Sequence, residues 1–374
     1  MISIKSYIAL FIAVVTCLSF VVSPAIAQEG QIVRNKVYAP SLEGNLIGDS
    51  PNNRNVTIYL PPSYDIELDK LYPVVYLLHG FSANNDAWVA SANENILESM
   101  KQWLKDGKVK EMILVMPNSS NRFIGSQYSN SITTGNWGDY IAKDIVNYID
   151  SNYRTIPQRE SRAVFGHSMG GHGAVRIGLT YSDIFSCMGA SSGDYDMEDY
   201  INSNKVTWAI SSALEDWNQY RASGWSVWEA MSWNAAFAPN PDRPPFYCDS
   251  PFVYTKTEPK EIVKNQEAYD RFMKLDIVKN LNSYLDKLLT MRAIYIDCGT
   301  SDGLIKHARK MHDGLSNLGI KHTYNEFKGD HACCVMNSTG NALELFSNAM
   351  DFEVITSVEP VKKLTTSWGY MKDR

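Results

Sequence analysis

The stretch from Ser161 to Tyr181 constrains the fold of this chain more than any other. Its sequence, SRAVFGHSMGGHGAVRIGLTY, predicts a buried strand over 162–165, a tight turn, and a helix of small residues that begins near Met169. The turn GHSMG matches G-x-S-x-G with Ser168 at its centre. A serine in so sharp a bend needs neighbours without side chains, so this pattern between a strand and a helix predicts a nucleophile elbow.

A second G-x-S-x-G occurs at 189–193, GASSG, with Ser191 at its centre. The residues that follow it are polar and rich in turn formers, and they do not open a helix directly behind the serine. We therefore expect Ser168, and not Ser191, to be the nucleophile. The alternative for Ser168 is a plain turn serine in a glycine-rich loop.

The bulk composition is that of an ordinary globular protein. The 374 residues are 44% hydrophobic and 20% charged, and the formal net charge is −6. This length suits one large domain or two small ones. The mild acidity and the lack of a basic block argue against a nucleic-acid partner.

The first 27 residues have the pattern of a signal peptide. Lys5 supplies a positive charge, an apolar run covers 7–22, and Ala25-Ile26-Ala27 fits a cleavage site. The apolar run is short for a membrane-spanning helix, although an uncleaved anchor is the alternative. We expect a mature protein from Gln28 onward that is secreted or periplasmic and has no membrane span.

Export of the chain would permit its cysteines to form disulfides. Without Cys17 the chain keeps an odd number of cysteines, Cys187, Cys248, Cys298, Cys333 and Cys334, and their spacing fits no zinc site. We expect Cys298 to pair with Cys333 or Cys334, because both segments should reach the same edge of the sheet. Buried free cysteines are an equally good alternative.

Strand-like and helix-like segments alternate along most of the chain. Apolar runs predict strands over 33–38, 55–60, 72–78, 112–116, 162–165, 184–190, 293–297 and 323–327, and helices over 93–105, 139–153, 304–318 and 341–350. This alternation predicts an α/β fold in which a mostly parallel sheet carries helices on both faces. The polar stretch 119–136 should form a long loop over the catalytic edge.

An insertion of different character interrupts this rhythm at about 194–289. Five of the nine tryptophans lie within 208–233, and a proline-rich stretch follows. A second domain with its own core is one interpretation. We favour a Trp-rich lid that packs over the C-terminal edge of the sheet.

The nucleophile needs a base that follows it in the chain. His331 lies in the loop KGDHACC directly after the last predicted strand, where a side chain can reach the elbow. His172 lies one turn into the elbow helix and should point away from the nucleophile. His307 and His312 lie on a helix with polar neighbours, so we expect both at the solvated surface.

The base needs a carboxylate that orients it. Asp302 lies in CGTSDG, in the loop after a predicted strand, and is our candidate. Asp297 should lie inside that strand, and Asp330 is too close to the base in sequence. Asp194 and Asp196, which follow the preceding strand, remain competitors.

Two backbone N–H groups should stabilise the oxyanion. One belongs to Met169, the residue after the nucleophile, and the other to Phe81, after the HG of YLLHGF.

The chain resembles the putative-esterase family of α/β-hydrolases. The resemblance lies in YPVVYLLHGF, FGHSMGGHGAVRIGL, CGTSDG and GDH, within about 54–193 and 293–331. The family includes S-formylglutathione hydrolase, feruloyl and acetylxylan esterases, and mycolyltransferases of the antigen 85 type. The resemblance implies the same residues: Ser168 as nucleophile, Asp302 as acid, His331 as base, and Phe81 and Met169 as oxyanion donors.

Two departures from the family pattern put the substrate in doubt. The Trp-rich insertion matches no member, and Ala-Cys-Cys follows His331 in place of the usual Asp-Trp. Trp225, Trp228 and Trp233 are the candidate substrate-binding residues, because their rings suit an aromatic acyl group or a sugar. A small aromatic core that holds the insertion together is the alternative.

The sequence thus predicts a secreted serine esterase without metal or organic cofactor. The expected substrate is a small-molecule or polysaccharide-linked ester, such as a feruloyl or acetyl ester. An acyltransferase, a peptidase and a non-catalytic binding protein of the same fold are the alternatives.

Overall fold

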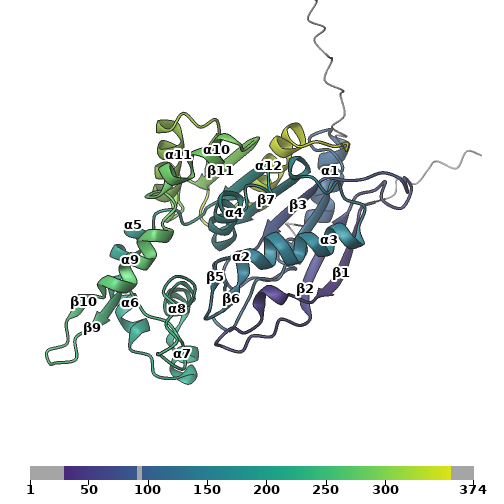
Figure 1. Cartoon of the computed structure of the whole chain (residues 1–374). Coiled ribbons are helices and arrows are strands. Elements are labelled where there is room, and N and C mark those ends of the chain that lie inside the picture. The colour runs from purple at the N-terminus through teal and green to yellow at the C-terminus, as the bar shows by residue number, and fades with distance from the viewer. Residues whose placement is uncertain (1–28, 91–94, 355–374) are drawn as a thin grey trace, which may run out of the picture.

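An eight-stranded sheet forms the centre of the computed structural model, which describes residues 29–90 and 95–354 (Figure 1). The strand order is β1-β2-β4-β3-β7-β8-β11-β12. The strands are β1 (Gln31–Val37), β2 (Arg54–Leu60), β3 (Val74–Leu78), β4 (Ile113–Pro117), β7 (Arg162–His167), β8 (Cys187–Ser191), β11 (Ala293–Gly299) and β12 (Thr323–Phe327). β2 runs antiparallel to β1 and β4, and all other pairs are parallel. The predicted mostly parallel sheet is confirmed, whereas the predicted signal peptide lies outside the described residues.

Both faces of the sheet are buried, as the continuous apolar runs of its strands require. In β3, Val74, Tyr76 and Leu78 face one core, while Val75 and Leu77 face the other. Helices α3 (Val146–Asn152), α4 (Met169–Thr180) and α11 (Ile305–Asn317) cover the first face. Helices α1 (Ile96–Lys105) and α12 (Val335–Ala349) cover the second.

Two predicted helices differ in detail from the structure. The segment predicted as one helix over 139–153 consists of α2 (Trp137–Asp139), a π-helical stretch Tyr140–Ile145, and α3. Helix α12 begins at Val335, before the predicted 341, although VMNSTGN has low helix propensity. Packing explains this start, because Gly340 lies so close to the Trp103 ring that an added Cβ would come within 2.6 Å of it.

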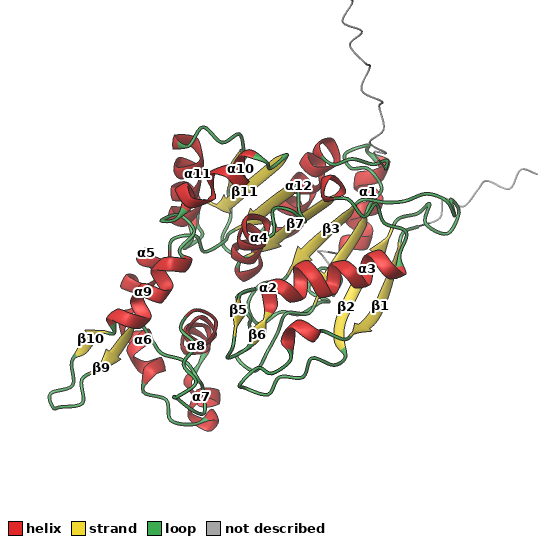
Figure 2. Cartoon of the chain, viewed as in Figure 1, coloured by secondary structure: helices red, strands yellow, loops and turns green. Residues whose placement is uncertain are grey.

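The insertion is a mainly helical lobe beside the sheet (Figure 2). The lobe contains α5 (Met197–Ser203), α6 (Lys205–Ser212), α7 (Trp217–Ser223), α8 (Trp225–Phe237), β9 (Phe252–Tyr254), β10 (Ile262–Lys264) and α9 (Gln266–Leu275). The last elements of the insertion, the 3₁₀ helix Leu281–Tyr284 and α10 (Leu285–Leu289), pack against the first sheet core. The buried side chains of the lobe form one small hydrophobic cluster of their own, and a second cluster that they share with Ile47 and Phe123 outside the insertion. The insertion therefore holds itself together and does not rely on the sheet for all of its core.

The predicted loop 119–136 joins the insertion to the sheet. It contains a short hairpin, β5 (Asn130–Ser131) and β6 (Gly135–Asn136). Gln127 donates a hydrogen bond to Ser232 of α8, and Ser131 donates one to the Ala235 carbonyl. These bonds fix α8 against the C-terminal edge of the sheet.

The cysteines do not pair as predicted. Cys333 and Cys334, which are adjacent in sequence, are bonded to each other, and Cys298 is free. The Cys298 side chain is fully buried in the first sheet core and lies 3.7 Å from the Ser192 hydroxyl. It therefore points into the core and away from the loop that follows β12.

Within residues 29–90 and 95–354, no helix is both long and apolar enough to cross a membrane.

Candidate active site

The turn between β7 and α4 holds Ser168 in a strained conformation. Its φ of 58° and ψ of −124° lie outside the regions that most L-residues adopt. Glycine is required on both sides, because a Cβ on Gly166 would lie 2.1 Å from the Gly170 carbonyl oxygen. A Cβ on Gly170 would lie 1.9 Å from the Leu78 carbonyl oxygen. The elbow therefore forms through backbone contacts that only this glycine pattern allows.

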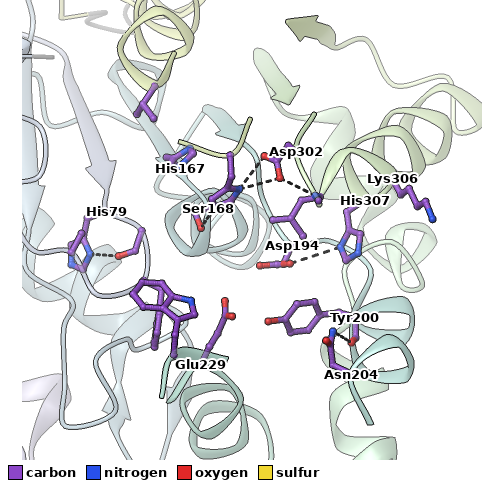
Figure 3. Close-up of a pocket in the computed structure, with 18 of the residues that line it drawn as sticks. His79, His167, Ser168, Asp194, Tyr200, Asn204, Glu229, Asp302, Lys306 and His307 are labelled. Atoms are coloured by element: carbon purple, nitrogen blue, oxygen red, sulfur yellow. Dashed lines mark hydrogen bonds and ion pairs between the residues drawn. The ribbon is translucent and has the colours of Figure 1, made fainter. Parts of the chain in front are cut away.

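Two loops at the same sheet edge bring a histidine and a carboxylate to this serine. His331 Nε2 lies 2.8 Å from Ser168 Oγ. His331 Nδ1 lies 3.0 and 3.1 Å from the two carboxylate oxygens of Asp302 (Figure 3). Asp302 follows β11 and His331 follows β12, so parallel strands deliver both side chains to one edge.

The charges of this pair are set by their contact. Burial raises the pKa of the Asp302 carboxyl, but hydrogen bonds from His331 and from the Leu304 N–H outweigh it and hold the pKa at about 2. The hydrogen bond to Asp302 raises the pKa of His331, against a smaller opposing effect of burial. Asp302 is thus anionic at neutral pH and stabilises the imidazolium that forms when His331 takes up a proton.

The competing residues do not take part in the contacts between Ser168, His331 and Asp302. Ser191 is buried at the end of β8. Asp194 lies 3.9 Å from His307 and Asp196 pairs with Lys310. Asp297 accepts a hydrogen bond from the Tyr295 hydroxyl. Asp330 accepts hydrogen bonds from the N–H groups of Ala332 and Cys333.

The loop after β3 passes directly beside the serine. A Cβ on Gly80 would lie 3.4 Å from the Ser168 Cβ. The neighbouring His79 fixes this loop: its Nε2 accepts from the Ser119 N–H, and its Nδ1–H donates to the Gly80 carbonyl, both at 2.9 Å. Burial lowers the pKa of His79 to about 4, so the ring is neutral and can make both bonds.

The two residues predicted to supply oxyanion donors lie near each other. A Cβ on Gly125 would contact both the Phe81 ring, at 2.5 Å, and the Met169 sulfur, at 2.7 Å. Met169 is the first residue of α4, so its N–H has no partner within the helix. Helix N-termini favour negative charge, which suits a developing oxyanion at this position.

A cavity of about 810 Å³ opens over Ser168. One part of its wall is apolar and includes Phe81, Ala83, Ala87, Trp88, Trp225 and Val335. Another part is polar and includes Asp194, Asp199, Tyr200, Glu229, Lys306 and His307. His307 was expected at the solvated surface, but it is only 3% exposed, because the insertion covers it.

Only one of the three candidate tryptophans lines this cavity. Trp225 is 53% exposed, and its ring meets that of Phe81 edge to face at 5.2 Å. Trp228 donates its indole N–H to the Tyr220 carbonyl inside the insertion. Trp233 is 0% exposed and packs on the ring of His172. The prediction of a substrate contact is therefore wrong for Trp233, which belongs to the aromatic core of the insertion.

Several cavity residues escaped the sequence analysis. Tyr200 and Glu229 line the cavity from the insertion, but neither belongs to a motif, and only a structure could place them. Ser192 hydrogen-bonds the Asp302 carboxylate and helps to keep its pKa low. Its place directly after β8, at the carboxyl end of a parallel strand, is a signal that could have found it.

Within the part of the chain that the structure describes, no group of three His, Cys, Asp or Glu side chains could hold a metal ion.

The sheet order, the elbow and the Ser168–His331–Asp302 geometry together define an α/β-hydrolase. A model of the putative esterase family matches residues 49–334, so the chain belongs to that family. An esterase of Mycobacterium tuberculosis is 25% identical over 292 residues, which cover 75% of this chain and 52% of that protein. An acetyl esterase of Caldicellulosiruptor saccharolyticus is 23% identical over 292 residues, 77% of this chain and 87% of that protein.

Solved structures agree on the fold. A ferulic acid esterase superposes with a TM-score of 0.60 at 20% identity and covers 86% of this chain and 99% of its own. The S-formylglutathione hydrolase of Staphylococcus aureus superposes with a TM-score of 0.56 at 18% identity, and the match covers 85% of this chain and 99% of that chain. The chain spans about half the length of the mycobacterial esterase that it matches.

Proposed function

We propose that the protein is a serine esterase that hydrolyses carboxylic esters through an acyl-enzyme. The observation that carries this proposal is the 2.8 Å contact between Ser168 Oγ and His331 Nε2, with Asp302 on the other ring nitrogen. A hydroxyl so close to a neutral imidazole can lose its proton to it while it attacks an ester carbonyl.

The reaction follows from this arrangement in two halves. Ser168 attacks the carbonyl carbon, His331 takes the serine proton, and the Phe81 and Met169 N–H groups hold the oxyanion. His331 then protonates the alcohol as the C–O bond breaks and leaves an acyl group on Ser168. Water deprotonated by His331 attacks the acyl carbon, and His331 returns this proton to Ser168 Oγ as the bond between the acyl carbon and Oγ breaks, which releases the acid and restores the serine.

The substrate and the location are parts of the same proposal. The relatives named feruloyl esterase and acetyl esterase support a feruloyl or acetyl ester, free or linked to a polysaccharide. The signal-like pattern of residues 1–27 supports export to the periplasm or the medium. An N-terminal sequence that starts at Gln28 in the exported protein would support this location, and an intact N-terminus would contradict it.

The test is a rate profile on p-nitrophenyl acetate, butyrate and octanoate and on methyl ferulate. Wild type should turn over, and Ser168→Ala should lose a factor of about 10⁶ in kcat. Ser191→Ala is the matched control, because it removes the serine of the other G-x-S-x-G and should retain activity. Full activity of Ser168→Ala would refute the nucleophile, and acyl transfer to added alcohols that outpaces hydrolysis would make the protein an acyltransferase.

A further inference from the structure

Three polar side chains converge on the cavity without a role in the proposed chemistry. The carboxyl groups of Asp194 and Glu229 and the phenol of Tyr200 point toward the same space near Ser168 (Figure 3). They come from three segments: the loop after β8, helix α8 and helix α5. Helices α5 and α8 belong to the insertion, and Asp194 lies where the insertion leaves the sheet, so this wall is formed where the lobe meets the sheet.

Asp194 is the most unusual member of this wall. It is only 3% exposed, and its Oδ1 has no hydrogen-bond partner among the described residues. The nearest group that could carry a positive charge, His307 Nδ1, is 3.9 Å away. A buried carboxyl oxygen without a hydrogen-bond partner costs free energy. A hydrogen-bond donor on a bound molecule would remove this cost, so the oxygen favours binding of such a molecule.

The charge state of the wall restricts the kind of molecule that it accepts. Burial, and then the nearby Glu229 carboxylate, raise the pKa of Asp194 well above its ordinary value, and burial also raises the pKa of Glu229. His331 and Asp302 also face Asp194, and His331 and Tyr200 face Glu229. Two such carboxyls resist carrying two negative charges, so the protonated form is favoured, and the wall can both donate and accept hydrogen bonds. An anionic group would be repelled.

An aromatic surface lies in the same cavity. Trp225 is half exposed at the start of α8 and presents its ring beside Phe81. A flat ring packs against the apolar C–H face of a sugar, and hydroxyls at the rim of that sugar need partners that donate and accept. Trp225 supplies the flat ring, and the carboxyl wall supplies the hydrogen-bond partners. The two lie one helical turn apart, because Trp225 and Glu229 are at i and i+4 on α8.

We propose that Asp194, Glu229 and Tyr200 form a hydroxyl-recognition subsite, and that the ester substrate carries a neutral polyol such as a sugar ring. The proposal rests on the ester hydrolysis proposed above and names the group that the insertion contributes to it. The carboxyls hydrogen-bond hydroxyls of the substrate while Trp225 covers the apolar face of its ring.

Four acetyl esters that differ only in the alcohol test this subsite. They are an O-acetylated methyl xyloside, 2-methoxyethyl acetate without a hydroxyl, acetylcholine as a cation, and the acetyl ester of lactate as an anion. Wild type should have the highest kcat/KM for the xyloside and the lowest for the anion. The ratio of kcat/KM for the xyloside to that for 2-methoxyethyl acetate should fall about ten-fold in Asp194→Asn and in Glu229→Gln. The matched control is Glu215→Gln, an exposed glutamate of the same insertion, which should leave the ratio unchanged.

The outcomes separate this inference from the proposed esterase activity. If wild type hydrolyses the esters but the ratio stays the same in Glu229→Gln, or if acetylcholine is preferred, the subsite is refuted and the esterase stands. If wild type hydrolyses none of them, and none of the p-nitrophenyl esters or methyl ferulate, the proposed function fails. Calorimetric titration of methyl β-xyloside then decides the subsite, because binding that Glu229→Gln weakens supports it and lack of binding to wild type overturns it. The half-buried Glu229 keeps the test valid if Asp194→Asn does not fold.

Discussion

Helices α4 and α8 both begin at the cavity, but they pack in opposite ways. Helix α4 approaches the sheet through glycines, and a Cβ on Gly170 or Gly171 would lie within 2.8 Å of the carbonyl oxygen of Leu78 or Ser191. Helix α8 fills the insertion with large side chains such as Trp233 and Phe237, whose rings are 5.0 Å apart. Backbone contacts tolerate one residue type and therefore leave a sequence signature, whereas side-chain packing tolerates many and leaves none.

The largest expected effect on activity concerns a residue that a strand end positions, Asp302. Asp302→Asn should lower kcat about 10⁴-fold, because the amide no longer stabilises the imidazolium. The acid limb of the pH profile of kcat/KM reports the protonation of His331, whose pKa is raised chiefly by its hydrogen bond to Asp302. This limb should therefore shift to lower pH in Asp302→Asn. Asp313→Asn, an exposed carboxylate on α11, is the control, and an unchanged limb would contradict the proposed role.

The next effect falls on the packing of the insertion. Trp233→Ala should lower the free energy of unfolding by about 4 kcal/mol, because it empties a fully buried site against His172. Urea unfolding followed by circular dichroism measures the change. A loss below about 1 kcal/mol would mean that Trp233 is not part of the core of the insertion.

Helix α4 gives a sharper test of the backbone contact. Gly170→Ala places a methyl group 1.9 Å from the Leu78 carbonyl oxygen and should cost about 3 kcal/mol of folding free energy. At Gly303 an added Cβ meets no atom within 4 Å, so Gly303→Ala should change stability by less than about 0.5 kcal/mol. Equal stability of the two variants would show that the elbow does not need its glycine.

The smallest expected change in stability is at the exposed end of α8. Trp225→Ala should alter the free energy of unfolding by about 0.5 kcal/mol, because the ring is 53% exposed. It should nevertheless lower kcat/KM for the O-acetylated xyloside about five-fold, since the apolar face of the sugar loses its partner. If stability falls as far as in Trp233→Ala, the contrast between the two ends of the helix is lost.

The comparison explains how much the sequence could predict. The elbow, its glycines and the parallel strands follow from short-range patterns, so Ser168 and the sheet could be predicted. His331 and Asp302 required only the chain order and the rule that parallel strands end at one edge. Their role in catalysis stays a prediction until the variants are measured.

The residues of the insertion could not be placed in the same way. Trp225 and Trp233 are equally hydrophobic, and only the three-dimensional packing decides which of them reaches the cavity. His307 looked exposed because its neighbours on α11 are polar, yet the insertion buries it. The vicinal Cys333–Cys334 bond could not be predicted, because disulfides usually join residues that are distant in sequence.

The position of the insertion between β8 and β11 also bears on how the protein is made. Ser168 leaves the ribosome with the first part of the sheet, but β11 and β12, which carry Asp302 and His331, follow only after about a hundred further residues. Joining β11 to β8 closes a loop of that length, and its entropic cost grows only slowly with the number of residues. Because the insertion has a hydrophobic cluster of its own, it can condense first and bring the two strands together. In a nascent chain, Ser168 would thus lack its base and its acid until β11, β12 and the loops after them have been synthesised.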